Sequence, residues 1–271
     1  MNADTMALLR YFYESIDIFI LIMVRVVAFF LLVPVLSSMN IPVVIRILVS
    51  LCVTVMIFMS GSVSGDAAVY GDNVNGYFML IVNEFFTGVM MGFMVFAVFN
   101  LIYYTCHWIE HEIGLAMANV LDPMSQIQVP ILGNIFFLAA SAILVVTGGL
   151  NGFIGVFYSS YTLLPIGSAK ILNNPLLALS ALTMLTQFIN LAIRIAFPIV
   201  GSIVVLNVAL GIMVKAAPQM NVFVVGMPIK VLVGLILVYL VLAPALLTIY
   251  NMVYDMAYEA LIDVIWGMAD G

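Results

Sequence analysis

The sequence IAFPIVGSIVVLNVALGIMV (Ile195–Val214) is followed, after a short polar segment, by VLVGLILVYLVLAPALLTIYNMVY (Val231–Tyr254). Neither run contains a charged residue, and each has the roughly 20 residues that a helix needs to cross the hydrocarbon core of a bilayer. The polar segment begins at Lys215 and ends at Lys230, and its prolines remove backbone donors. Because an unpaired backbone group in hydrocarbon costs several kcal/mol, the pattern predicts a helical hairpin whose break lies in the polar segment.

The composition extends this prediction to the whole chain. Hydrophobic residues make up 66% and charged residues 7% of the 271 positions, whereas a soluble domain carries about 25% charged residues. The formal net charge of −6 leaves no basic patch for nucleic acid. Cys52 and Cys106 lie in apolar context, so we expect core residues and no disulfide. Residues 1–4 lack a basic stretch, so no cleaved signal peptide is expected. We predict an all-α integral membrane protein in contact with lipid.

Apolar runs and chain breakers predict the remaining helices. We expect one membrane-type domain over residues 1–271, built of hydrophobic helical hairpins with Pro and Gly breaks. Glycines four residues apart, Gly88 with Gly92 and Gly148 with Gly152, are spaced for close helix packing. The expected helices are Ile16–Val35, Val43–Met59, Tyr77–Trp108, Val129–Val146, Phe153–Leu164 and a long helix that begins at Pro175 and kinks at Pro198.

The segment of residues 110–123 separates two of these helices. Gly114 and the small residues after it hold a helix poorly, and Asp122 is disfavoured in helical geometry because Pro123 follows it. Such a segment could be a connecting loop, a plug that occludes a pore or a re-entrant element. Irregular backbone at membrane depth persists only when it is buried in protein or lines a cavity. The sequence alone favours a connection.

Three ionisable residues, Arg25, Glu84 and Arg194, lie within otherwise apolar runs. A charge at the centre of a bilayer costs at least about 2.5–3.5 kcal/mol on insertion scales. The arginines could snorkel or pair inside the protein, or the charges could line a conduction or proton-relay path. One scattered acid makes a poor relay, so the sequence favours snorkelling or pairing.

The sequence His107-Trp-Ile-Glu110-His111 fits the inverted zincin pattern H-x-x-E-H. On a helix the two histidines would share a face, and Glu110 could act as general base toward a zinc-bound water. A catalytic zinc needs three protein ligands, and no third ligand stands in an organised setting. We therefore interpret the motif as a polar helix end and predict no metal site.

Longer motifs resemble one known family. The run GIMVKAAPQMNVFVVGMPIK (Gly211–Lys230) resembles the signature of the FliR/SctT family, export-gate proteins of bacterial flagellar and virulence type III secretion systems. GLAMANVLDP (Gly114–Pro123) and VPILG (Val129–Gly133) resemble the central segment of that family and the start of its next helix. The resemblance covers nearly the whole chain. Lys215 stands where the family pattern has arginine, which keeps the charge and loses planar bidentate bonding.

The resemblance implies a function without covalent catalysis, cofactor or metal. It implies one subunit of a helical pore assembly with FliP- and FliQ-type proteins, joined by FlhB- and FlhA-type partners, in the bacterial inner membrane at the flagellar basal body. Unfolded flagellar proteins would pass through the pore. The implied pore-plug residues are Gly114, Leu115, Ala116, Met117, Ala118, Asn119, Asp122 and Pro123, and the implied hairpin-tip or interface residues are Lys215, Pro218, Gln219, Asn221, Phe223 and Lys230.

Two other functions stay open at this point. An intramembrane zinc metalloprotease would use the motif at residues 107–111. A small-molecule transporter would use the broken helices near Lys215 and Lys230, although no internal repeat of the kind such transporters often show is evident.

Overall fold

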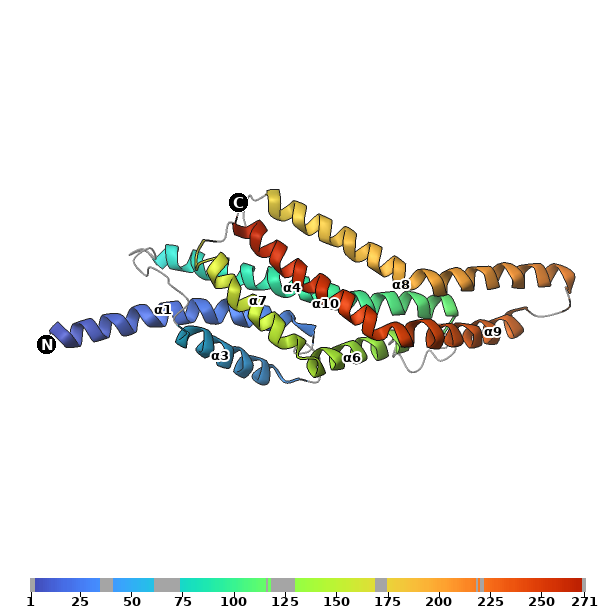
Figure 1. The fold of residues 1–271 in the computed structure, drawn as a ribbon, viewed down its shortest axis with the longest axis horizontal. Coiled ribbons are helices and arrows are strands. Elements are labelled where there is room, and N and C mark those ends of the chain that lie inside the picture. Colours follow the sequence, from blue (N-terminus) through green and yellow to red (C-terminus); the bar gives the residue numbers. More distant parts are fainter. Residues whose placement is uncertain are drawn as a thin grey trace. The chain divides into compact units, whose positions relative to one another are not determined.

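The computed structural model describes residues 3–34, 41–60, 74–115, 117, 130–168, 175–217, 219 and 222–269. Within these ranges every regular element is a helix and no strand occurs, so the all-α prediction is confirmed (Figure 1). The helices are α1 (Ala3–Leu32), α3 (Val43–Met59), α4 (Val74–Ile113), α6 (Ile131–Val146), α7 (Gly149–Leu163), α8 (Pro175–Ala216), α9 (Val222–Leu237), the π-helical turn η2 (Val238–Leu242) and α10 (Ala243–Ala269).

Several helices are longer than the apolar runs predicted. Helix α3 has the predicted bounds, whereas α1 begins at Ala3 and not at Ile16. Helix α4 extends past Trp108 to Ile113, so the first four residues of the predicted 110–123 segment are helical. The prediction counted only apolar length, but Leu, Met, Arg and Glu are good helix formers whatever their polarity. Polar and charged turns therefore continue these helices.

The break in the predicted hairpin is also shorter than expected. Helix α8 ends at Ala216 and α9 begins at Val222, so Pro228 and Lys230 lie inside a helix and not in the tip. Helix α8 also contains Pro198 within its length, and the kink predicted there stays a prediction. In apolar surroundings the helix is the conformation that satisfies most backbone groups, so a proline is accommodated within it. A π-helical turn, η2, lies just before Pro244 in α10, which is one of the ways a helix adjusts around a proline.

The chain divides into two compact units. One contains Met1–Ala97, Gly148–Met184 and Met256–Gly271, and the other contains Val98–Thr147 and Leu185–Asp255. In the first unit, fully buried Phe29 of α1 packs on Phe157 of α7 with ring centroids 4.8 Å apart. In the second unit, Tyr103 of α4 meets Phe137 of α6 edge-on, with centroids 6.4 Å apart. Each unit therefore has an aromatic contact between helices far apart in sequence.

Helix α4 crosses α1 at the predicted glycine pair. A Cβ atom on Gly88 would meet the carbonyl oxygen of Arg25 and would lie 2.8 Å from Cβ of Ala28. A Cβ atom on Gly92 would lie 2.8 Å from the carbonyl oxygen of Phe29. The close-packing prediction for this pair is therefore confirmed. Gly148, from the second predicted pair, instead has φ +74° between α6 and α7, a left-handed conformation that favours glycine.

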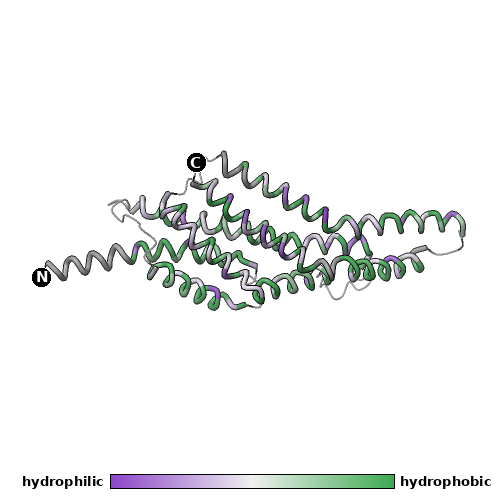
Figure 2. The backbone as a smooth tube through the Cα atoms, in the orientation of Figure 1, coloured by the Kyte–Doolittle hydropathy of each residue, from purple (hydrophilic) through white to green (hydrophobic). Residues whose placement is uncertain are grey.

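Much of the apolar surface is not covered by the chain itself. Among the described residues, Gly76–Ile113, Leu182–Ala216 and Val224–Val241 are long and apolar enough to cross a membrane, and α6 with α7 could form a fourth span. Figure 2 shows hydrophobic residues along most of α8 and α9. Only 22% of the apolar window in α8 and 17% of that in α9 is buried, against 50% in α4. Lipid or other protein must therefore cover α8 and α9.

We predict that Gly88→Ala destabilises the contact between α1 and α4. The added methyl group meets backbone and not a flexible side-chain end, so overpacking is expected to cost about 1–3 kcal/mol. Thermal unfolding of the detergent-solubilised protein measures the loss. Gly155→Ala in α7 is the matched control, since a Cβ there meets nothing within 4 Å. Equal unfolding temperatures for the two variants would contradict the close approach.

Candidate functional site

The predicted plug and hairpin-tip residues fall in three groups. Gly114, Leu115 and Met117 of the central segment and Lys215, Gln219 and Lys230 of the hairpin are described. Phe223 lies in helix α9, and its side chain is outside the described part of the chain. The remaining predicted residues lie outside the described residues: Ala116, Ala118, Asn119, Asp122, Pro123, Pro218 and Asn221.

Helix α4 ends at Gly114 in a Schellman motif. The Gly114 N–H donates to the carbonyl oxygen of His111 at 3.1 Å, and the Leu115 N–H donates to that of Glu110 at 3.2 Å. Gly114 has φ +91°, the left-handed conformation that this motif places just after the helix. The glycine that the sequence marked as a helix breaker is therefore the stop signal of α4, and the central segment leaves the helix there.

An apolar groove lies between the start of the central segment and α9. It has a volume of about 660 Å³ and is lined by nine residues, all but Gly114 with apolar side chains. The lining residues are Gly114, Leu115, Met117, Met227, Pro228, Val231, Leu232, Leu235 and Ile236. Nearby, Gly234 of α9 packs against the fully buried side chain of Ile113. Two segments that the sequence singled out separately thus meet within one unit.

Polar side chains at the hairpin break are exposed. Lys215 in the last turn of α8 and Gln219 after it are exposed, whereas Lys230 is half-buried within α9. A cation at a helix C-terminus is favoured by the helix dipole, which gives Lys215 a structural reason for its place. Both lysines are therefore on helices that flank the break and not on the turn itself.

Glu110 accepts two backbone hydrogen bonds and is buried. The N–H groups of Ile131 and Leu132, at the start of α6, donate to its Oε1 and Oε2 at 3.1 and 3.2 Å. Its neighbours in the H-x-x-E-H motif, His107 and His111, are exposed. In the described part of the chain no three His, Cys, Asp or Glu side chains gather as metal ligands. The geometry gives the zinc-protease alternative no support, because the expected general base already binds a helix terminus.

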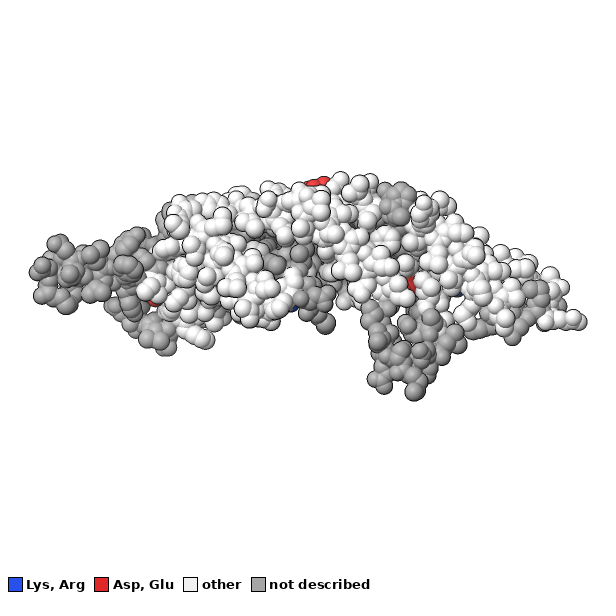
Figure 3. Space-filling model, turned by 90° about the horizontal axis from the view of Figure 1, so that it is seen from below, with Lys and Arg blue, Asp and Glu red and all other residues white. Residues whose placement is uncertain are grey.

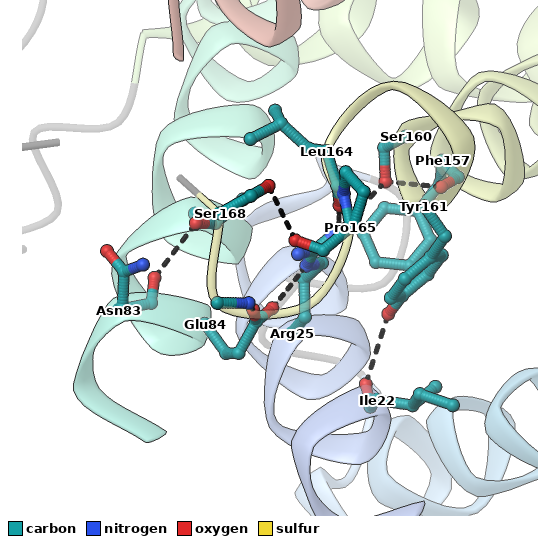
Figure 4. A network of polar contacts seen from close by, with 12 residues as sticks. Ile22, Arg25, Asn83, Glu84, Phe157, Ser160, Tyr161, Leu164, Pro165 and Ser168 are labelled. Atoms are coloured by element: carbon teal, nitrogen blue, oxygen red, sulfur yellow. Dashed lines mark hydrogen bonds and ion pairs between the residues drawn. The ribbon is translucent and has the colours of Figure 1, made fainter. Parts of the chain in front are cut away.

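The buried charge pair lies in the other unit (Figure 4). Arg25 of α1 donates from Nε to Oε2 of Glu84 in α4 at 2.5 Å, and both side chains are fully buried. Arg25 Nη1 also donates to the carbonyl oxygen of Leu164 at 3.2 Å. The guanidinium lies 4.4 Å from the ring centroid of Tyr161 in α7. Of the alternatives left open for Arg25, the structure shows pairing inside the protein.

The same carboxylate fastens the turn after α7. The Gly167 N–H donates to Glu84 Oε1 at 2.9 Å, and Gly167 has φ +78°. Glu84 therefore uses both oxygens, one for a cation on α1 and one for a backbone donor. Arg194, the third charge predicted in an apolar run, is exposed on α8. On the face shown in Figure 3, charged residues are few and isolated among apolar and neutral ones.

The sequence matches the family described as "Bacterial export proteins, family 1" over residues 16–256. This chain belongs to that family. The export protein is 24% identical over 245 residues to the flagellar biosynthetic protein FliR of Bacillus subtilis, covering 90% of this chain and 92% of that protein. It is 26% identical to FliR of Escherichia coli K12, with 90% of each chain covered.

The chain is also similar to a protein that is not named for flagellar biosynthesis. The surface presentation of antigens protein SpaR of Shigella flexneri is 25% identical over 235 residues, covering 84% of the export protein and 88% of SpaR. The family resemblance drawn from residues 211–230 and 114–133 is thus confirmed. The matched range also includes Arg25, Glu84, Glu110 and the α8–α9 hairpin.

Sequence reasoning missed the partners of the buried acids in this export protein. Glu84 was predicted as a charge in an apolar helix, but nothing in the sequence pointed to the Gly167 N–H as its second partner. Glu110 was considered only as part of a zinc motif. Pro130 at the N-cap position of an apolar helix, where Ser, Thr, Asp or Asn would act as cap, was the available signal that a distant group caps α6.

We predict strong coupling between Arg25 and Glu84. Either Arg25→Met or Glu84→Met leaves the partner charge buried without its counter-ion, which is expected to cost about 3–5 kcal/mol. The double variant Arg25→Met with Glu84→Met should cost less than the two single losses combined. Thermal unfolding in detergent measures all of them. Arg194→Met, at an exposed position, serves as the control with little change; additive single losses would argue against a functional pair.

Proposed function

We propose that this export protein is a pore subunit of the bacterial flagellar export gate. It assembles with FliP- and FliQ-type subunits in the inner membrane, at the basal body, with FlhB- and FlhA-type proteins as further partners. Unfolded flagellar proteins pass through the pore, and the central segment helps to close it at rest. Family membership and relatives named for flagellar biosynthesis support this assignment.

The observation that carries the proposal is the apolar groove at Gly114. There the start of the central segment faces α9, the second helix of the hairpin. Leu115 is half-buried and Met117 is 44% exposed, so these side chains are available for further contact. A closed pore must hold back ions and water while yielding to an arriving chain. Apolar, adaptable side chains such as methionine fit that task, because they exclude water without fixed polar bonds.

The outer surface supports an assembly. On α8, Phe197 and Val205 are each 70% exposed, and Tyr239 of η2, which follows α9, is 73% exposed. An exposed apolar surface of this extent is typical of lipid contact or of an obligate interface. The exposed Lys215 and Gln219 at the hairpin break would meet neighbouring subunits. We assign no covalent chemistry, cofactor or metal to the protein.

Co-purification tests the assembly. The tagged export protein, extracted from membranes in mild detergent together with FliP- and FliQ-type proteins, is expected to elute in one complex with both, because α8 and α9 need a partner surface. Size-exclusion chromatography and mass spectrometry of the eluate measure this. An unrelated tagged membrane protein from the same cells is the control. A stable monomer, eluting alone after expression beside those subunits, would contradict the proposal.

We predict that Met117→Asp opens a leak in the resting gate. The carboxylate brings water into an apolar contact, so small-ion conductance of the assembled gate should rise. Conductance of vesicles holding the purified gate, or ion entry in cells without export substrate, measures the change. Met117→Leu keeps the side chain apolar and of similar volume, so the conductance of the resting gate should not rise. Equal conductance for the two variants in a correctly assembled gate would count against the sealing role.

A further inference from the structure

Glu110 stands at the base of the central segment. It belongs to the last turns of α4, four residues before the Gly114 stop. Its side chain is 2% exposed although it carries a carboxylate. A buried carboxylate without a cation needs several donors, and the described contacts show where two of them come from. Both are backbone N–H groups of α6, which begins on the far side of the segment.

Helix α6 has no cap of its own. Its N-cap position is Pro130, which makes no side-chain capping bond, and the first turn holds no acidic residue. The first N–H groups of a helix have no partner within the helix, and in apolar surroundings each would be costly. Glu110 satisfies two of them at Ile131 and Leu132 with charge-assisted bonds. Its negative charge also lies at the positive end of the α6 dipole.

The same residue also ends α4. The carbonyl oxygen of Glu110 accepts the N–H groups of Gly114 and Leu115, both at 3.2 Å. One residue therefore fixes where the chain leaves α4, by its backbone, and where it enters α6, by its side chain. Helices α4 and α6 also approach each other closely at a second point. A Cβ on Gly133 of α6 would lie 3.0 Å from the carbonyl oxygen of Tyr103 in α4, so the backbones approach closely.

We propose that Glu110 is a positioning residue that fastens the end of α4 to the start of α6 and so holds Leu115 and Met117 in place at the groove in the closed gate. This inference rests on the proposed sealing role of the segment. The tie joins the Gly114 end of α4 to the Ile131 start of α6. It gives the H-x-x-E-H motif a purpose other than zinc chemistry: Glu110 binds two backbone donors, while His107 and His111 face outward.

The test compares variants in the assembled gate by two independent measurements. Hydrogen exchange of the amides at the start of α6, followed by mass spectrometry, reports the tie itself. Small-ion conductance reports the seal. Glu110→Gln keeps the size of the side chain but turns one acceptor into a donor that faces a backbone N–H. We expect exchange at Ile131 and Leu132 to rise about tenfold or more, as the loss of a hydrogen bond to a charged group implies, and conductance to rise with it.

Two further variants complete the design. Glu112→Gln removes the same charge two residues along α4 and should change neither measurement. Glu110→Asp keeps the charge on a shorter side chain, so exchange should rise less than in Glu110→Gln; it also replaces that variant if Glu110→Gln does not assemble. Unchanged exchange in both Glu110 variants, or an equal rise in Glu112→Gln, would overturn the tie.

The two roles fail in different ways. Faster exchange with normal conductance in Glu110→Gln, while Met117→Asp leaks, would show that the segment seals without being positioned by Glu110. Normal conductance in both Glu110→Gln and Met117→Asp would instead overturn the sealing role of the segment. Exchange at the start of α6 would then still report whether Glu110 caps that helix.

Discussion

Backbone N–H and C=O groups have no water to bind in apolar surroundings, so every one of them must find a partner within the protein. This constraint decides how the export protein begins and ends its helices. Helix α8 runs through Pro198 without a break, and a π-helical turn precedes Pro244. Where a helix does end, at Gly114, the chain turns at once into a motif that satisfies the last carbonyl groups.

The same constraint explains why a few acids lie in the interior of so apolar a chain. Glu84 and Glu110 are both buried, and each accepts backbone N–H groups from a segment far away in sequence. Glu84 also forms an ion pair with Arg25, so the two buried charges cancel. These carboxylates are distant caps for donors that no local side chain serves. A proton relay is not needed to explain either of them, because each one is accounted for by its bonds.

Features set by residues close together in the sequence could be predicted, whereas features that depend on residues far apart in the sequence could not. The bounds of α3 and the close approach of Gly88 to α1 were predictable, since apolar length and glycine spacing are local signals. The hairpin was predictable too, but its break proved shorter, because Pro228 is accommodated in α9. The partners of Glu84 and Glu110 could not be predicted. They are backbone N–H groups at Gly167 and Ile131, and nearly every residue has such a group, so the residue type does not identify the donor. Only the fold brings such groups together.

Charged hydrogen bonds hold helices together inside the protein, whereas the outer surface of α8 and α9 is largely apolar. Inside the protein, Arg25 and Glu110 add charged hydrogen bonds to the aromatic and glycine contacts between helices. The surfaces of α8 and α9 are largely apolar and mostly uncovered. Such a surface can slide or re-pack against lipid and protein, since dispersion contacts are individually weak. For the proposed pore to widen around a passing chain, rigid internal ties combined with apolar outer contacts would let whole helices move while their ends stay capped.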